Sequence, residues 1–513
     1  MAELIVQARW VVTGIKDRFT PVVIDQGAVL SRDGVIAAAG TLEEMRQLAP
    51  AAELKKYPDH AMLPGFVNSH HHVGMTPLQL GSPDHALELW FASRMPARRI
   101  DLTLDTLYSA FEMIASGITT VQHIHGWMPG GYEAIHGGAS KVLGAYRSLG
   151  MRASYCYAVR EQNRLVYEAD EDFCARLPPA LGEKLMAHFK SQTMPFEDFL
   201  KLFDQLTAEN SGHALTRVQL APANLHWCTD DGLIELNRKS RAAGVPMHMH
   251  LLETAYQKEY ARRRTGKTAL RHLHDLGVLG PHMTLGHGVW LNEEDIDIVA
   301  DTGTCICHNC SSNFRLRSGL APLNRWEAKG ITVGMGLDEA GINDDRDMLS
   351  ELRLALRVHR EPGMDEEDVP TCPQVVKMAT EAGALTTAFG ATIGRLDEGR
   401  FFDAVLINWT KATYPYQDPD IPMLDALVQR AKTGAVDAVF INGEVVYEDG
   451  RFTRIDRDAV LAEIADTLGK PRSPDEVARR ELGLEVFPHV KKFYAGYLPE
   501  APPSPFYANS ARN

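Results

Sequence analysis

Three consecutive histidines, His70, His71 and His72, stand at the end of an apolar run that is expected to form a strand. Because successive side chains of a strand point to opposite faces, His70 and His72 are expected to share one face and His71 to point to the other. Imidazole nitrogens are common ligands of zinc and of other divalent transition metals. The spacing of His70 and His72 therefore indicates two ligands of one metal ion.

Four more residues suited to metal or proton chemistry follow later apolar runs. His250 is followed three residues later by Glu253, and His287 and Asp338 each end a further run. A lone histidine in such a place is more often a core residue, but several of them together with an aspartate are poorly explained by packing. Three imidazoles and one carboxylate, with a position left for water, form the ligand pattern of a catalytic zinc ion. These residues predict a hydrolytic metal centre.

The runs that carry these residues alternate with amphipathic stretches in which apolar residues recur every three or four positions, as expected for helices. Eight such runs occur, at residues 61–70, 117–125, 152–159, 217–226, 245–253, 283–289, 303–309 and 331–338. Eight strand–helix alternations predict a (β/α)₈ TIM-like barrel, whose active site lies at the C-terminal ends of the strands. An open doubly wound sheet is the alternative, but its GxGxxG fingerprint does not follow the first strand.

Both ends of the chain are rich in short β-branched runs separated by turn residues. One late run contains Asn442-Gly443 between apolar stretches, which is a strong hairpin signal. We therefore predict an α/β chain in which residues 1–60 and 395–455 form a small β-sandwich domain and residues 61–394 form the barrel. The remaining residues, 456–513, are a C-terminal extension whose aromatic side chains are expected to pack on the barrel or on a neighbouring subunit. A loosely ordered terminus is the alternative.

Composition excludes some classes of partner. The 513 residues carry a formal charge of −14, which disfavours nucleic-acid binding. No apolar stretch is long enough to suggest a membrane span, and no signal peptide is indicated. Seven cysteines suggest reduced thiols and a cytoplasmic protein. Cys305, Cys307 and Cys310 are close in sequence, but no second CxxC pair completes four ligands, so we interpret them as core residues. We expect a small-molecule substrate and a homodimer or higher homo-oligomer.

The order of the motifs resembles the amidohydrolase superfamily, in the branch that contains cytosine and guanine deaminases and triazine chlorohydrolases. The resemblance covers roughly residues 1–455. It is carried by PGFVNSHHH (64–72), HLLET (250–254), GHGVWL (286–291), CHNCSSNFRLRSGLAPL (307–323), GMGLD (334–338) and GRLDEGRFFDAVLIN (394–408). These motifs are specific because they are collinear with those of the family.

The resemblance implies that one divalent ion, Zn²⁺ or alternatively Fe²⁺, is bound by His70, His72, His250 and Asp338. It also implies that Glu253 and His287 move protons beside the ion. A divalent metal lowers the pKa of bound water to about 7, and Asp338 is able to accept the proton of that water. No lysine ends the run 217–226, so a two-metal arrangement with a carboxylated lysine is not expected.

The chain departs from many relatives in its fourth run, where Ala223 replaces a substrate-contacting histidine and His226 replaces a common aromatic residue. This difference indicates a pocket unlike that of nucleoside deaminases. We predict substrate contacts, each with a structural role as the alternative, for Trp90, His125, Glu161, Asn163, His226, Asn313 and Glu339.

The resemblance implies hydrolysis at an electrophilic carbon of a nitrogen heterocycle, with deamination favoured. Dechlorination, dealkylamination or desulfurisation of a triazine-like ring, or hydrolysis of a urea or cyclic amide, are the alternatives, because the metal activates water without selecting the leaving group. A non-catalytic scaffold is disfavoured, since the expected ligands and both proton carriers are present.

Overall fold

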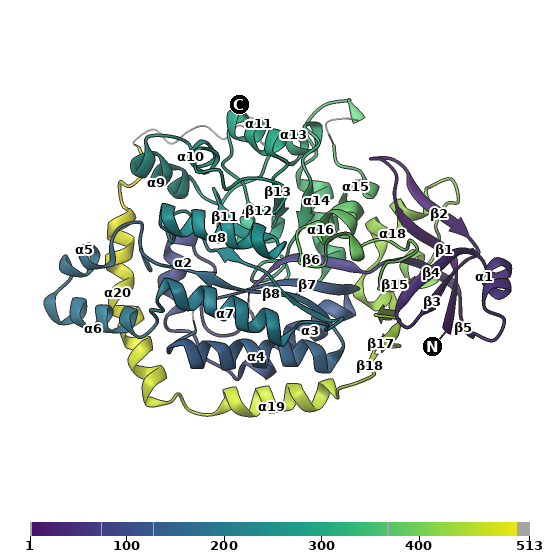
Figure 1. The fold of residues 1–513 in the computed structure, drawn as a ribbon, viewed down its shortest axis with the longest axis horizontal. Coiled ribbons are helices and arrows are strands. Elements are labelled where there is room, and N and C mark those ends of the chain that lie inside the picture. Colours follow the sequence, from purple (N-terminus) through teal and green to yellow (C-terminus); the bar gives the residue numbers. More distant parts are fainter. Residues whose placement is uncertain (1–2, 73, 127, 367–368, 500–513) are drawn as a thin grey trace.

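The computed structural model describes residues 3–72, 74–126, 128–366 and 369–499. Residues 1–2 of the predicted small domain and 500–513 of the predicted extension lie outside the described residues. Figure 1 shows a large body of strands and helices, a sheet built from both chain ends on one side of it, and two C-terminal helices along its surface.

Parallel strands form the large body. Its first sheet consists of β6 (Phe66–His71), β7 (Ile118–His125), β8 (Arg152–Val159), β9 (Thr216–Val218) and β10 (Ala221–Pro222), and its second of β11 (Met247–Leu251), β12 (Met283–His287), β13 (Cys305–His308) and β14 (Val333–Met335). Parallel bridges Leu220–Met247 and His71–Asp338 join the two sheets at both edges. With β9 and β10 counted as one interrupted strand, these eight strands close the predicted (β/α)₈ barrel.

Helices cover the barrel strands, and every residue of β7 is buried, as expected for a parallel strand covered on both faces. Local signals start and stop the helices: the Thr229 hydroxyl caps the start of α8, and Gly244 ends that helix in left-handed backbone. The helices of the barrel are α2 (Leu87–Arg94), α3 (Leu102–Ala115), α4 (Tyr132–Leu149), α5 (Asp170–Ala175), α6 (Pro179–Lys190), α7 (Phe196–Glu209), α8 (Asp230–Ala243), α9 (Ala255–Thr265), α10 (Ala269–Asp275), α11 (Glu293–Thr302), α12 (Cys310–Arg315), α13 (Leu323–Ala328), α14 (Met348–Val358), α15 (Cys372–Met378), α16 (Glu381–Leu385) and the short η2 (Gly390–Thr392).

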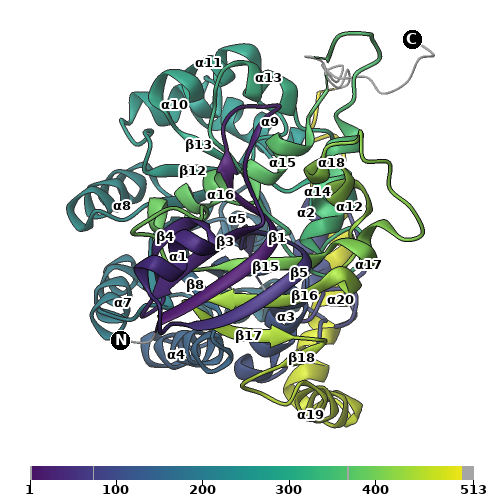
Figure 2. The same ribbon diagram turned by 90° about the vertical axis from the view of Figure 1, so that its right-hand side faces the viewer.

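The chain ends meet in a nine-stranded sheet of order β18-β17-β16-β15-β5-β1-β3-β4, with β2 also paired to β1 (Figure 2). Its strands are β1 (Glu3–Ile15), β2 (Pro21–Asp25), β3 (Gly27–Arg32), β4 (Val35–Thr41), β5 (Glu53–Pro64), β15 (Ala404–Asn408), β16 (Val436–Ile441), β17 (Glu444–Glu448) and β18 (Arg451–Phe452). Val6, Val29, Met62 and Phe440 pack together in one buried cluster, so this continuous sheet curves around its own core. The strand β5 runs past residue 60 and leads directly into the first barrel strand.

The predicted hairpin at Asn442-Gly443 is confirmed. Both residues adopt left-handed backbone, with φ of 54° and 78°, in the turn that joins β16 to β17. The remaining helices near this sheet are α1 (Leu42–Leu48), α17 (Trp409–Thr413), α18 (Met423–Arg430) and the short η3 (Thr433–Ala435).

The C-terminal extension forms α19 (Arg457–Gly469) and α20 (Pro474–Tyr494), and Figure 1 shows both on the surface of the barrel. The helix α20 contacts α2 and α6. Near its end, Tyr494 and Tyr497 are buried, and Tyr494 meets Tyr167 edge-on with ring centroids 5.4 Å apart. These two tyrosines of the extension thus pack on the barrel within this chain. Among the described helices, none combines the length and apolar character needed to cross a bilayer.

Candidate metal centre and active site

Three imidazole nitrogens converge at the C-terminal end of the barrel. The Nε2 atom of His70 lies 3.0 Å from Nε2 of His72 and 3.1 Å from Nε2 of His250. The Nε2 atoms of His72 and His250 are 3.0 Å apart. His70 and His72 come from the end of the first barrel strand and His250 from β11, so the alternation predicted from the sequence places both strand-end histidines in the barrel mouth.

The other ring nitrogens fix the protonation of these imidazoles. Nδ1 of His72 donates to the carbonyl of Ile124 (2.7 Å), and Nδ1 of His250 donates to the carbonyl of Ala223 (2.8 Å). Each ring therefore presents a bare Nε2 lone pair when neutral. Burial, together with the neighbouring imidazoles, lowers the pKa of His250. Lone pairs that face one another without a proton between them repel, so this donor set fits a divalent cation.

Asp338 completes the cluster, with its Oδ1 3.1 Å from Nε2 of His72 and 3.6 Å from Nε2 of His70. Burial alone would raise the pKa of Asp338, but the hydrogen bond and charge of His72 outweigh it, so this pKa is held well below its usual range. The hydroxyl of Ser312 donates to the other carboxylate oxygen at 2.6 Å. Asp338 is therefore ionised at neutral pH and adds an anionic ligand atom.

The backbone around Asp338 is unusual. Asp338 and His287 adopt left-handed backbone, with φ of 54° and 73°, which costs on the order of 1 kcal/mol for a residue other than glycine. Two residues earlier in the strand, a Cβ atom at Gly336 would lie 2.6 Å from Cβ of His70. Only glycine at this position lets the eighth barrel strand approach the first closely enough to bring Asp338 to the histidines.

Glu253 and His287 lie beside this cluster. Nε2 of His287 is 3.5 Å from Oε2 of Glu253 and 3.7 Å from Oδ2 of Asp338. Nδ1 of His287 donates to Oδ1 of Asn313 at 3.0 Å, which leaves Nε2 unprotonated in the neutral ring. The amide nitrogen of Asn309 lies 3.3 Å from this Nε2. Burial, reinforced by the charge of Asp338, raises the pKa of Glu253 well above its ordinary value. Two nearby carboxyl groups are thus held in opposite protonation states.

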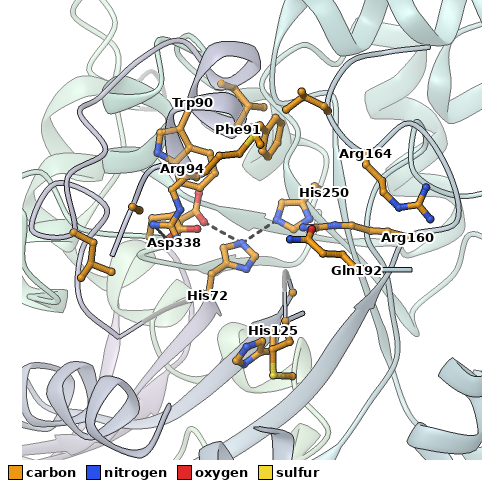
Figure 3. A pocket seen from close by; sticks show the side chains of 18 of the residues that line it. His72, Trp90, Phe91, Arg94, His125, Arg160, Arg164, Gln192, His250 and Asp338 are labelled. Carbon is orange, nitrogen blue, oxygen red and sulfur yellow. Dashed lines mark hydrogen bonds and ion pairs between the residues drawn. The ribbon is translucent and has the colours of Figure 1, made fainter. Parts of the chain in front are cut away.

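A cavity of about 320 Å³ opens over the cluster. Figure 3 shows Trp90, Phe91 and Arg94 on one side of His72 and Asp338, with His125 on the opposite side. The apolar rings of Trp90 and Phe91 in α2 therefore face the polar side chains of the metal cluster. This combination suits a flat, partly polar ring.

The structure brings some of the predicted substrate contacts to this cavity. Trp90, His125 and Glu339 line it. Burial, with the charges of His72 and Arg160, lowers the pKa of His125 to about 4, so its ring is neutral. Asn313 instead contacts His287 and positions that ring.

Three other predicted contacts are not among the cavity-lining residues. The carboxylate of Glu161 accepts hydrogen bonds from the amide (2.9 Å) and hydroxyl (3.0 Å) of Thr229 at the start of α8. Asn163 donates to the carbonyl of His226 at 2.8 Å, and the His226 ring packs on Tyr167 with centroids 4.5 Å apart. Their polar atoms and rings are occupied by local structure, which corrects the expectation that they face the substrate.

Two groups that the structure brings to the site had no role predicted from the sequence. Nε2 of His248 lies 2.8 Å from Nδ1 of His70 and so supports that ring from behind. Its place two residues before His250 in the same strand is the sequence signal that would have identified it. The second group consists of the arginines that line the cavity, Arg94, Arg98, Arg99, Arg160, Arg164 and Arg479.

The cysteine cluster lies behind the site. Cys305, Cys307 and Cys310 are buried and free of disulfides, as are the other described cysteines. Cys310 also belongs to a second group of potential ligands with His308 and His359, whose Nε2 atoms are 2.9 Å apart. Those two rings hydrogen-bond to each other, and burial raises the pKa of the Cys310 thiol, so it is protonated.

Comparison with known sequences finds a matching family and similar proteins. A family model described as the amidohydrolase family matches residues 61–446. The chain is 28% identical over 445 residues to a 5-methylthioadenosine/S-adenosylhomocysteine deaminase of Syntrophobacter fumaroxidans, covering 86% of this chain and 92% of the relative. It is 30% identical over 451 residues to the deaminase of the same name from Pyrococcus furiosus, covering 87% of this chain and 96% of the relative.

Solved structures share the fold. An adenosine deaminase of Xanthomonas campestris with bound zinc superimposes with a TM-score of 0.76 at 22% identity, covering 91% of this chain and 98% of that one. An atrazine chlorohydrolase of Arthrobacter aurescens in complex with zinc superimposes with a TM-score of 0.73 at 19% identity, covering 90% and 99%. The same architecture therefore occurs in proteins named for different leaving groups.

Proposed function

Because this chain belongs to the amidohydrolase family, we propose that it is a metal-dependent hydrolase that releases ammonia from a nitrogen heterocycle. The observation that carries this proposal is the convergence of the Nε2 atoms of three histidines, 3.0–3.1 Å apart, beside Asp338 and Glu253, whose pKa values are shifted in opposite directions. The deaminases among its relatives support the choice of leaving group.

The metal would be held by His70, His72, His250 and Asp338, and Zn²⁺ is the ion we favour, with Fe²⁺ as the alternative. When bound, a divalent ion acidifies water, so that a strong nucleophile is available at neutral pH. One ion is proposed, since the ligand atoms converge on a single point.

The protein groups around that point would move the protons. Asp338, ionised, accepts a proton from the attacking water, while the bare Nε2 of His287 orients the water through a second hydrogen bond. Glu253, protonated, donates to the ring nitrogen next to the reacting carbon as the new C–O bond forms. The proton held by Asp338 then passes to the amino group, the C–N bond breaks and ammonia leaves. As the carbonyl forms, the hydroxyl proton of the adduct passes to Glu253 and restores its protonated state.

Other leaving groups remain candidates. The same groups would serve the loss of chloride, an alkylamine or a thiol from a triazine-like ring, or the hydrolysis of a urea or cyclic amide. Among the relatives, the atrazine chlorohydrolase supports the first of these. Two carboxyl groups held in opposite protonation states are expected in a catalytic site. We therefore do not favour a non-catalytic scaffold.

The location, the domain division and the oligomeric state of the protein are also proposed. We propose a cytoplasmic location, supported by the free, buried thiols of the described cysteines. We also propose the domain division at residues 1–60 with 395–455, 61–394 and 456–513, and a homodimer or higher homo-oligomer. Light scattering on the purified protein tests the last of these.

One experiment tests the main proposal. The purified full-length protein is analysed for bound metal and then screened with pterins, purines, pyrimidines, triazines and ureas for ammonia release. We expect about one zinc or iron ion per chain and ammonia release that a chelator abolishes and Zn²⁺ restores. A protein that binds neither metal, or one that releases chloride or another group but no ammonia from any of these compounds, would refute deamination.

A further inference from the structure

The cavity over the metal centre has a strongly cationic wall. Six arginines line it, whereas the lining carboxylates are Asp105, Glu253, Asp338 and Glu339. Asp338 belongs to the metal cluster, and Asp105 accepts hydrogen bonds from the backbone amides of Gly74 and Met75. Arg164 is paired with Asp170, which does not line the cavity, at 2.6 Å, but the arginines still outnumber the lining carboxylates.

Two of these arginines retain unused hydrogen-bonding capacity. Nη1 of Arg94 and Nη2 of Arg479 are buried atoms that have no hydrogen-bond partner among the described residues. The nearest carboxylate to Arg94 is that of Glu339, at 3.8 Å, which is too long for a hydrogen bond. Within the described ranges, no carboxylate lies within ion-pair distance of Arg479. Buried guanidinium N–H groups without partners are costly unless a ligand completes them.

Arg479 comes from the C-terminal extension, and the packing of α20 holds it at the cavity. A Cβ atom at Gly483 would lie 2.7 Å from Cδ of Pro96 and 2.9 Å from Cβ of Met95, so glycine lets α20 touch the segment that follows α2. One turn earlier, Nη1 of Arg479 donates to the carbonyl of Met95 at 3.0 Å. This bond holds the Arg479 guanidinium beside the cavity that it lines.

The charges around Arg479 are mostly of the same sign. Burial lowers the pKa of Arg479 to about 10, and the charges of Arg99, Arg472 and Arg94 act in the same direction. Glu476 opposes them, but its carboxylate is already used by the Arg99 amide (3.3 Å) and lies 3.7 Å from the Arg98 guanidinium. An anion bound here would relieve this repulsion.

We propose that Arg94 and Arg479 form a subsite for an anionic substituent, a carboxylate or a phosphate, on the ring that is hydrolysed at the metal centre. The planar, forked guanidinium group matches both kinds of anion. Arg94 follows Trp90 by one helical turn in α2, and its Cζ lies 5.1 Å from the Trp90 ring centroid, so ring and anion would be held by one helix. The family match ends at residue 446, before α20, so Arg479 lies outside the matched region.

The identity of the ring rests on the proposed function, whereas the anionic substituent is inferred from the arginines alone. The test therefore uses matched pairs of compounds that differ by one substituent: pterin and pterin-6-carboxylate, cytosine and cytosine-5-carboxylate, and adenosine and its 5′-phosphate. Binding to the zinc-loaded, full-length protein is measured by calorimetry, and ammonia release is measured separately. At least one charged compound is expected to bind about 10- to 100-fold more tightly than its neutral partner.

Substitutions test whether Arg94 and Arg479 cause the preference for charged compounds. Arg479→Met and Arg94→Met are expected to remove the preference for the charged compound, whereas Arg479→Lys restores part of it. Arg480→Met is the matched control, because Arg480 is the next residue of α20 and is exposed. For a compound that is turned over, Arg479→Met is expected to raise KM and leave kcat nearly unchanged, because this residue lies away from the reacting atoms.

The outcomes separate the two proposals. Tight binding of a charged compound that depends on Arg479 but yields no ammonia supports the subsite and contradicts deamination of that ring. Ammonia release from neutral compounds, with no gain from any charged partner, overturns the subsite and leaves deamination intact. Preference for the carboxylates would identify a carboxylate as the anionic substituent. Preference for the 5′-phosphate would identify a phosphate. Charge preference that survives both Arg94→Met and Arg479→Met also overturns the subsite.

Discussion

The Nε2 atom of His287 lies 3.5 Å from a carboxylate oxygen of Glu253. The same nitrogen is 3.7 Å from Asp338, so one neutral imidazole stands between two carboxyl groups whose pKa values are shifted in opposite directions. This arrangement separates a proton donor from a proton acceptor within one small volume.

The role of Glu253 as a proton donor is tested by Glu253→Gln. This change keeps the size of the side chain but removes the transferable proton, so we expect kcat to fall by roughly 10²- to 10⁴-fold. Metal content is expected to stay unchanged, because Glu253 is outside the group of converging Nε2 atoms. Glu161→Gln is the matched control, since its carboxylate holds Thr229 instead. Full activity in Glu253→Gln would exclude it as the donor.

The raised pKa of Glu253 predicts a particular pH dependence. Burial and the charge of Asp338 keep the carboxyl protonated at low pH, and the proton is lost as pH rises through the raised value. The ratio kcat/KM should therefore decline on the alkaline side. The charge of Glu88 also raises this pKa, so Glu88→Gln is expected to move the decline to lower pH. A profile that rises with pH, or one that Glu88→Gln shifts to higher pH, contradicts the assignment.

His248 is predicted to tune the metal site without binding the ion. Its Nε2 is 2.8 Å from Nδ1 of His70, and partners of this kind typically contribute 10- to 100-fold to metal affinity. We expect His248→Phe to weaken zinc binding by about that factor in a chelator competition assay. His282→Ala, which removes a ring bonded to Asn237, serves as the control. Unchanged affinity in His248→Phe would show that His70 needs no such support.

Glu351 predicts a pH-dependent loss of stability. Its carboxylate accepts a hydrogen bond from the Ser311 amide at 3.0 Å, yet burial raises its pKa to about 7. A carboxyl with a raised folded-state pKa stabilises the fold most below its unfolded pKa of 4.5 and loses that contribution as pH rises to about 7. The loss is on the order of 3 kcal/mol.

Chemical unfolding at pH 5, 6, 7 and 8 measures this effect. Glu351→Gln does not titrate, so its free energy of unfolding should fall less between pH 5 and 8 than that of the parent protein. The exposed Glu398→Gln is the control and is expected to follow the parent. Parallel curves for Glu351→Gln and the parent would show that Glu351 titrates normally in the folded state.

The main ligands of the site could be predicted from the amino-acid sequence. Strand periodicity places His70 and His72 on one face, and barrel topology brings the ends of distant strands together, so the histidines and Asp338 could be grouped without coordinates. The Asn442-Gly443 hairpin was equally predictable, because left-handed backbone at two adjacent residues is a local property.

The residues that surround the metal centre could not be predicted in this way, because they depend on long-range packing. Asn163 lies four residues beyond the end of β8, but its left-handed backbone (φ 53°) accompanies a side chain that bonds the His226 carbonyl and does not line the cavity. Arg479 reaches the cavity because Gly483 lets α20 pack against Met95 and Pro96, almost 400 residues earlier in the chain. The spacing of apolar residues indicates which face of a segment is apolar, but it does not indicate which distant segment packs against that face. The direction of a loop side chain and the partner of a surface helix are set by that long-range packing.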